Sequence, residues 1–149
     1  MLRTLLRLTA VAAALSLAPA QAAAAPNVHH LSGGGTASIS QVAMNVSIDA
    51  SGSASGSFEC LMAGRSGFVL GQFGLVHNMI VHATPSTGSV VGSAVTFAGT
   101  ARLTLDGRQK MDVHVQVSAD VATQSFQLTV VEVGTLPVER LVSGHIALS

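Results

Sequence analysis

Apolar and small polar residues alternate along most of the chain after residue 31. In the first strong segment, Val42, Met44, Val46 and Ile48 fall on one side of an extended chain, and small or polar residues fall on the other. This period of two is typical of a strand with one buried face. No segment after that point combines a period of 3.6 residues with helix caps. The pattern therefore predicts an all-β protein.

Turn-forming residues divide this pattern into segments. A second strand is predicted to place Gly56, Phe58, Cys60 and Met62 on one face. Glycine-containing and proline-containing turns are expected at 49–52, 63–67 and 85–88. Gly71 and Gly74 indicate a bend or bulge between two short strands within 68–83.

The best-defined pair of strands lies on either side of Asp106 and Gly107. The apolar positions on both sides are odd-numbered: Val91, Val95, Phe97, Ala101, Leu103 and Leu105, then Met111, Val113, Val115 and Val117. A two-residue loop would pair residue 105 with residue 108 and lay an apolar face beside a polar one, because a one-residue slip exchanges the faces. We therefore expect a loop of odd length, most simply three residues ending with Gly107 in the left-handed conformation.

Further strands are predicted from Phe126, Leu128 and Val130, and from Ile146 and Leu148 at the end of the chain. Several short strands at close spacing indicate a single antiparallel β-sandwich or small barrel of about seven to nine strands. The sequence leaves the choice between sandwich and barrel open.

The first 22 residues have the organisation of a secretory signal peptide. Arg3 and Arg7 precede an apolar run over 8–18, and small residues follow it. Cleavage is expected after residue 20, 22 or 25. An uncleaved anchor would need about 20 apolar residues, and this run is shorter. We expect an exported bacterial protein, secreted or periplasmic, with a flexible polar lead over 23–35 and a β domain over 36–149.

The composition of the exported chain argues against some classes of partner. Without Arg3 and Arg7, five basic residues remain against seven acidic ones, a net charge of −2. There is no basic stripe, and the chain contains no Trp or Tyr. Nucleic-acid binding is therefore disfavoured, since it needs positive charge and stacking platforms.

Cys60 is the only cysteine, so an internal disulfide is impossible. It alternates with Phe58 and Met62 on an apolar face, where cysteine behaves as an inert, small apolar residue. The alternatives are a thiol nucleophile and an intermolecular disulfide.

The C-terminal half has a familiar order of segments. A strand ends at Leu105-Asp106-Gly107, a valine-rich strand follows over 113–117, then a strand at 126–130 and a final segment Ser143-Gly144-His145-Ile146. This order resembles the secreted bacterial β domains of the post-COAP type. The segment 119–123 is shorter than the loop usual at that place in the family and lacks its proline. The resemblance implies an exported β domain, and it implies no assigned activity.

The clearest candidates for chemistry are Asp112 and His114, which share the polar face of a predicted strand and could form half of a zinc site. The alternative is a solvated polar face beside Arg102 and Thr104. His77 and His82 are five residues apart, so a straight strand places them on opposite faces. The segment 52–56 has the glycine spacing of a nucleophile elbow, but Ala54 stands at the nucleophile position.

Three functions fit these observations. The first is a non-catalytic exported module with a structural, binding or adhesive role through its sheet faces or edges, alone, as a homo-oligomer or with an envelope or extracellular protein. The second is a barrel that carries a small apolar ligand among its phenylalanines. The third is a small enzyme or metal-binding protein that uses Asp112 and His114. The preferred first function requires no cofactor.

Overall fold

The computed structural model describes residues 28–69 and 74–149, and of residues 64–69 it describes the backbone only. The predicted signal peptide, residues 1–22, lies outside the described residues. The strands are β1 (His29–Ala37), β2 (Gln41–Ile48), β3 (Ala54–Val69), β4 (Leu75–Val91), β5 (Ala94–Leu105), β6 (Gln109–Asp120), β7 (Ser125–Val130), β8 (Gly134–Thr135) and β9 (Glu139–Leu148). All pairings are antiparallel, which confirms the predicted fold class.

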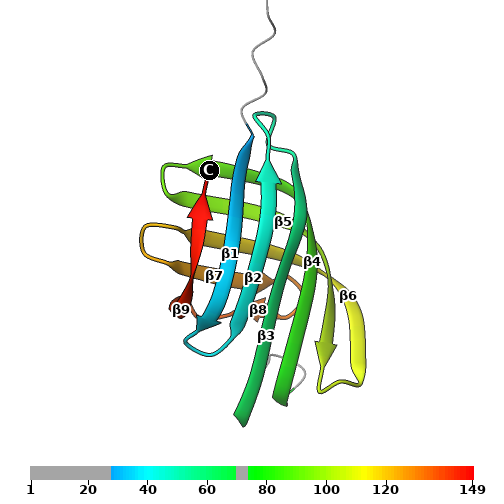
Figure 1. Cartoon of the computed structure of the whole chain (residues 1–149). Helices are drawn as coiled ribbons and strands as arrows, with labels where there is room; N and C mark the ends of the chain where they lie inside the picture. The colour runs from blue at the N-terminus through cyan, green and yellow to red at the C-terminus, as the bar shows by residue number, and fades with distance from the viewer. Residues whose placement is uncertain (1–27, 70–73) are drawn as a thin grey trace, which may run out of the picture.

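The strands form one sheet that closes in a ring. Each strand from β1 to β7 pairs with the next one along the chain, and β9 pairs with both β7 and β1. β8 adds only two residues beside the end of β7. Figure 1 shows β9, β1, β2 and β3 side by side in one layer, with β5, β6 and β7 crossing behind them. β4 begins beside β3 and continues into the second layer, so the ring is flattened into two layers.

The predicted turn at 85–88 is wrong, because these residues form a bulge inside β4. The register between β4 and β5 shifts between Pro85 and Thr87. A bulge bends a strand without ending it, and it tolerates proline, which has no N–H to donate to the ladder. The chain reverses instead at Gly92 and Ser93, between β4 and β5.

This bulge also exchanges the faces of β4. Val91, expected on the buried face, is therefore 77% exposed. The predicted turn at 63–67 is wrong for a similar reason, since β3 runs through it with a register shift against β4 between Ala63 and Phe68. Residues 29–35, expected in a flexible lead, lie in β1.

The loop between β5 and β6 has three residues, as the pattern of apolar positions predicted. Leu105 pairs with Gln109, and the N–H of Arg108 donates to the carbonyl of Leu105 at 3.1 Å. Gly107 is left-handed, with φ of 69°, but it is the middle residue of the loop, because Asp106 is also left-handed, with φ of 49°. The extra residue, Arg108, restores one apolar face across both strands.

The Asp106 carboxylate holds this loop against β4. Its Oδ1 accepts hydrogen bonds from the backbone N–H groups of His77 and Asn78 at 3.0 and 2.8 Å. The N–H of Asp106 donates in turn to the carbonyl of Asn78 at 2.9 Å. Hydrogen bonds from the backbone, chiefly from Asn78, lower the pKa of Asp106 below its usual value.

We expect Asp106→Asn to lower the unfolding temperature at pH 7 and to have little effect at pH 2. A carboxyl group with a depressed folded-state pKa stabilises the protein above its unfolded-state pKa, and this contribution is lost as the pH falls through the folded-state pKa. Thermal unfolding followed by circular dichroism at the two pH values measures the difference. Asp112→Asn is the control, because that exposed carboxylate only pairs with Arg102 at the surface. An equal loss at both pH values would contradict the charge-based explanation.

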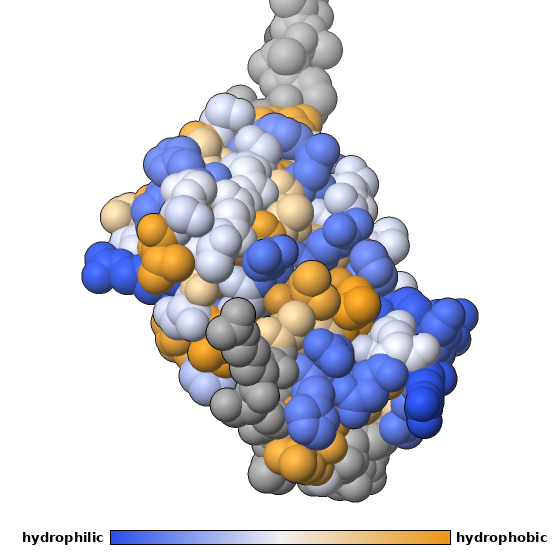
Figure 2. Space-filling model, turned by 60° about the horizontal axis from the view of Figure 1, so that its bottom comes forward, coloured by the Kyte–Doolittle hydropathy of each residue, from blue (hydrophilic) through white to orange (hydrophobic). Residues whose placement is uncertain are grey.

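The alternating apolar residues fill the space between the two layers, as predicted. Those below 7% exposure include Val42, Met44, Val46, Ile48, Phe58, Cys60, Met62, Val95, Phe97, Ala101, Leu103, Leu105, Val113, Val115, Val117, Phe126, Leu128, Val130 and Ile146. Phe58 packs edge-to-face on Phe97 and Phe126, with ring centroids 5.7 and 6.3 Å apart. On the face shown in Figure 2, apolar side chains occur in small patches between polar ones.

The ring is weakest between β7 and β9, which pair only through residues 125–126 and 139–140. Gln124 extends this junction with its side chain. Its Oε1 accepts from the N–H of Ile146 and its Nε2 donates to the carbonyl of Ile146, each at 2.9 Å. The side-chain amide therefore bonds to β9 as the backbone of a neighbouring strand would, and it covers part of an otherwise open strand edge.

Candidate functional site

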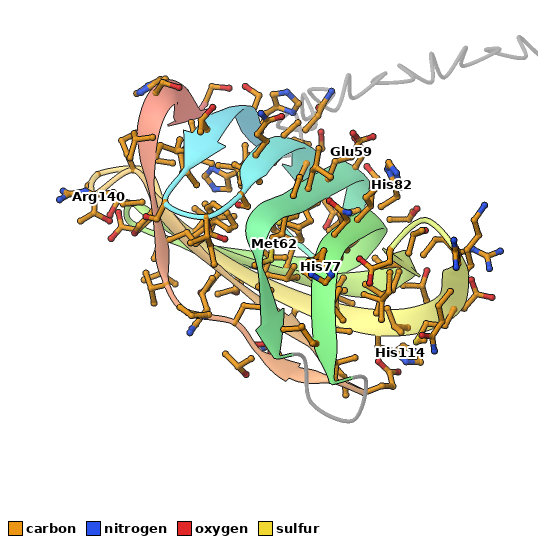
Figure 3. All side chains as sticks on the ribbon, turned by 90° about the horizontal axis from the view of Figure 1, so that it is seen from below. Glu59, Met62, His77, His82, His114 and Arg140 are labelled. Atoms are coloured by element: carbon orange, nitrogen blue, oxygen red, sulfur yellow. The ribbon has the colours of Figure 1, made fainter. Side chains whose placement is uncertain are left out.

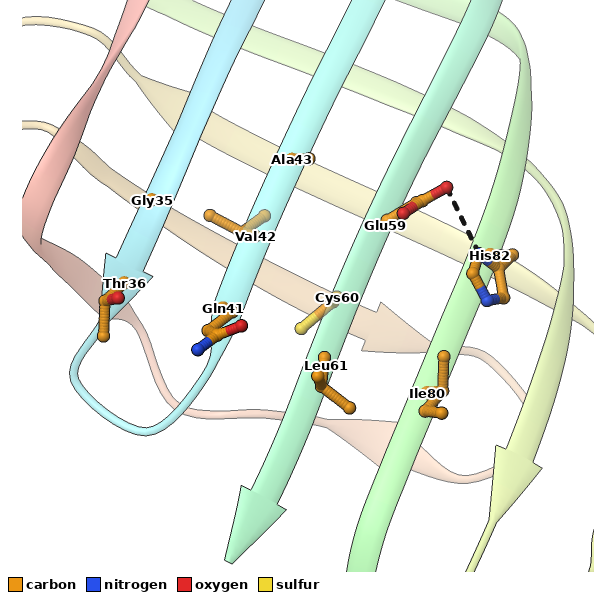
Figure 4. A pocket seen from close by; sticks show the side chains of 10 residues that line it. All are labelled: Gly35, Thr36, Gln41, Val42, Ala43, Glu59, Cys60, Leu61, Ile80 and His82. Atoms are coloured by element: carbon orange, nitrogen blue, oxygen red, sulfur yellow. Dashed lines mark ion pairs between the residues drawn. The ribbon is translucent and has the colours of Figure 1, made fainter. Parts of the chain in front are cut away.

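A groove of about 590 Å³ lies on the outer face of the first layer (Figure 4). It is lined by Gly35, Thr36, Gln41, Val42, Ala43, Glu59, Cys60, Leu61, Ile80 and His82, from strands β1 to β4. Its volume lies within the range of ordinary ligand pockets, about 300–1,000 Å³.

Strand register creates this groove. Two cross-strand rows of outward side chains border it, Ala43–Glu59–His82 and Gln41–Leu61–Ile80. Ala43 is small, and its pairing partner on β1, Gly34, has no side chain, so the surface is low on the β1 and β2 side. The larger side chains of β3 and β4 stand beside that depression. The result is an apolar floor with polar groups at its border.

Glu59 and His82 form the charged side of the groove. The Glu59 Oε1 lies 3.4 Å from the Nδ1 of His82, and their side chains are 58% and 56% exposed. Figure 3 shows the two side chains together on the outer side of the sheet, away from His114. The row continues from His82 to Arg102 and Asp112 on the next two strands. Arg102 lies 3.3 Å from Asp112, which compensates its charge.

Glu59 differs from the other six acidic residues in what its carboxylate contacts. Five of them accept hydrogen bonds from backbone N–H groups: Asp49 from Ser51 and Ser53, Asp106 from His77 and Asn78, Asp120 from Ala122 and Thr123, Glu132 from His114, and Glu139 from Ile39. The sixth, Asp112, is paired with Arg102. Within the described residues, His82 is the one polar partner of Glu59. Among the contacts of the described residues, the Glu59 carboxylate therefore holds no turn or loop.

The candidate pair Asp112 and His114 lies on the outer face of β6, but each residue has its own partner. Asp112 pairs with Arg102, whereas the Nδ1 of His114 lies 2.7 Å from Glu132. The same Glu132 carboxylate accepts a hydrogen bond from the N–H of His114 at 2.9 Å. These bonds, above all the side-chain bond to His114, lower the pKa of Glu132. The arrangement attaches the turn after β7 to the outer face of β6.

The other histidines are distributed over the surface. His77 and His82 are both exposed on β4, where an irregularity between Val76 and Met79 breaks the alternation. The Nδ1 of His30 lies 3.1 Å from the Ser47 hydroxyl. In residues 28–69 and 74–149, no three His, Cys, Asp or Glu side chains lie close enough together to hold a metal ion.

Cys60 points into the core, as its alternation predicted, and it is 1% exposed. Burial raises the pKa of its thiol to about 12, and the nearby Glu139 charge adds to this effect. Glu139 is itself buried, and its Oε2 accepts from the Ser40 hydroxyl at 2.9 Å. A thiol nucleophile must ionise and reach its substrate. Cys60 does neither in this fold.

Sequence reasoning missed Glu59 and the groove. Glu59 precedes Leu61 by two residues and His82 follows Ile80 by two, so each strand carries the pattern of a polar and an apolar residue on one face. That pattern alone does not show that the two strands are neighbours. The pairing partner of each residue came only from the fold.

No protein-family model matches the chain, and comparison with curated proteins and with solved structures finds no match. In the part of the chain that the structure describes, no helix is long and apolar enough to cross a membrane.

Proposed function

We propose that the chain is an exported, non-catalytic binding module that acts at the bacterial cell envelope or outside the cell. The observation that carries this proposal is the combination of a filled interior with an open groove on the outer face of β1 to β4. The features of a signal peptide at residues 1–22 support export, and the resemblance to post-COAP domains agrees with it.

Ring closure favours binding through a face over binding through a strand edge. An open sheet presents a row of unpaired N–H and carbonyl groups to other chains, and closure removes most of them. Here β9 pairs with both β1 and β7, and the Gln124 side chain covers part of the remaining gap. The outer face of the first layer is then the more suitable surface for a partner.

The packing of the interior makes surface binding the better proposal than an apolar-ligand carrier. Such a carrier needs space among its phenylalanines, but Phe58 packs on both Phe97 and Phe126, and all three rings are at most 2% exposed. The side chains of Phe68 and Phe73 lie outside the described part of the chain. An enzyme based on Asp112 and His114 is also less well supported, because these residues pair with Arg102 and Glu132.

Export and envelope binding are tested together by producing the full chain with a C-terminal tag in a bacterium. We expect a processed protein that begins at residue 21, 23 or 26, identified by mass spectrometry of the periplasm and medium. We also expect the purified, processed protein to sediment with washed envelopes from the same cells, in proportion to the amount of envelope. An unprocessed cytoplasmic product, or a processed monomer that remains in the supernatant, would contradict the proposal.

A further inference from the structure

The groove on the outer face of β1 to β4 has a specific chemical character, and its interpretation here rests on the proposed binding function. Its one carboxylate, Glu59, has neither a backbone donor nor an arginine as partner within the described residues. Its apolar part comes from Ala43, Leu61 and Ile80. We propose that this groove binds the arginine or lysine side chain of an extended peptide segment in a partner protein.

The shape of a basic side chain fits this arrangement. Lysine and arginine have apolar stems and a charged head, so the stem can cover an apolar surface while the head reaches an acidic group. In the groove, Leu61 lies two residues after Glu59 on the same face of β3, and Ile80 pairs with Leu61. The stem would lie on Leu61 and Ile80, and its head would reach the Glu59 carboxylate.

The charges around Glu59 determine the direction of approach. On the β4 side, His82 is paired with the Glu59 carboxylate. Arg102 on β5 follows His82 in the same cross-strand row. On the β2 side, the neighbour of Glu59 is Ala43, and Ala43 pairs with Gly34 on β1. Among the described residues, no lysine or arginine lies in this part of the row, which continues beyond Gly34 to His145 on β9. The ligand head therefore binds the Glu59 carboxylate on its Ala43 side, away from His82, while the stem runs over Leu61 from the Ile80 side.

The chain segment on either side of the basic residue also has partners in the groove. The amide of Gln41 and the hydroxyl of Thr36 are exposed at the β1 and β2 end, and each can bond to a peptide group. The chain supplies no Trp or Tyr for stacking on an aromatic or sugar ring. These features favour a peptide over a carbohydrate.

The test is an NMR titration of the processed, nitrogen-15-labelled protein with the peptide Ser-Thr-Leu-Arg-Leu-Thr-Ser and with a copy in which glutamine replaces arginine. We expect the arginine peptide to shift the amide signals of Ala43, Glu59 and Leu61, and to bind roughly ten times more tightly than the glutamine peptide, because a charge-assisted hydrogen bond is lost. Glu59→Gln should abolish this preference. Asp112→Asn, a matched loss of one exposed carboxylate outside the groove, should preserve it.

Three other results would contradict the inference. Equal binding of the two peptides, shifts confined to other strands, or the same loss in Asp112→Asn would overturn it. Unfolding curves of the Glu59→Gln protein separate binding from folding, since loss of one exposed ion pair leaves stability nearly unchanged. If the wild-type protein sediments with envelopes but does not bind the arginine peptide, the groove inference fails and the envelope function stands. If it does not sediment with envelopes, the envelope function itself fails.

Discussion

Replacing Phe58 by alanine is expected to lower the free energy of unfolding by about 3–5 kcal/mol, the usual loss for a fully buried phenylalanine. Phe58 has no exposed surface, and it lies on β3 with its ring against Phe97 of β5 and Phe126 of β7. It therefore connects the first layer to the second. The change removes both edge-to-face contacts and leaves a cavity between the layers. Urea unfolding followed by circular dichroism measures the loss.

Phe58→Leu is the control for this result. It keeps most of the apolar volume, so it should cost roughly 1 kcal/mol, in the range of volume-conserving core substitutions. Because small domains are stable by only about 5–15 kcal/mol, the alanine variant should lose a large part of the protein's stability. If alanine and leucine cost the same small amount, the interior around Phe58 is not packed as described, and the case against an interior ligand is lost.

Replacing Gly144 by alanine is expected to lower the free energy of unfolding by about 2–5 kcal/mol. Gly144 on β9 has φ of 89°, a conformation that costs a residue with a Cβ about 1–2 kcal/mol. A Cβ at this position would also overlap the carbonyl oxygen of Gly34 and lie 2.7 Å from the Cα of Gly35. These are backbone atoms of β1, so relief requires the two strands to move apart, at a further cost of about 1–3 kcal/mol. The pairing of β1 with β9 closes the ring.

Gly92→Ala separates the two causes. Gly92 lies in the turn between β4 and β5 with φ of 61°, and a Cβ there would meet no atom within 4 Å. It should cost only the conformational part, about 1–2 kcal/mol. Denaturant unfolding of both variants gives the comparison. Equal losses would mean that the close approach of β1 and β9 contributes nothing, contrary to the expectation.

The β-hairpin at Asp106 illustrates how much of this fold local sequence can predict. The odd-numbered apolar positions on both sides required an odd loop, because a single buried face must run across both strands. The loop has three residues. The prediction that the loop ends with Gly107 was wrong, because Asp106 also adopts the left-handed conformation and Arg108 is the last loop residue. Asp106 also makes hydrogen bonds to β4. Those bonds come from a strand that lies far away in the sequence.

β4 illustrates where local sequence fails. Pro85 and Gly88 are common turn residues, so the segment between them was predicted to be a turn. In the ring, the chain must bend there to pass from one layer to the other, and the same residues form a bulge. Whether such a segment reverses the chain or bends it depends on the strands on both sides, β3 and β5.

The candidate site was predictable only in part. The sequence singled out Asp112 and His114 because they share a face of one predicted strand, and the fold gives them separate partners. Glu59 and His82 are 23 positions apart, so their contact depends on the β3–β4 pairing. Glu59 stands out because five of the other six acidic residues accept hydrogen bonds from backbone N–H groups and the sixth pairs with an arginine. Those partners are known only from the fold.

By itself, the sequence determined the all-β class, the inward face of most strands and the burial of Cys60, because burial imposes a period of two on every half-buried strand. Only the tertiary structure decided that the sheet closes into a ring, that β4 bends through Pro85, and that Ala43, Glu59 and His82 form one row. Closure and rows depend on which strands are neighbours and in which register. These are non-local contacts, and alternation within a single strand carries no information about them.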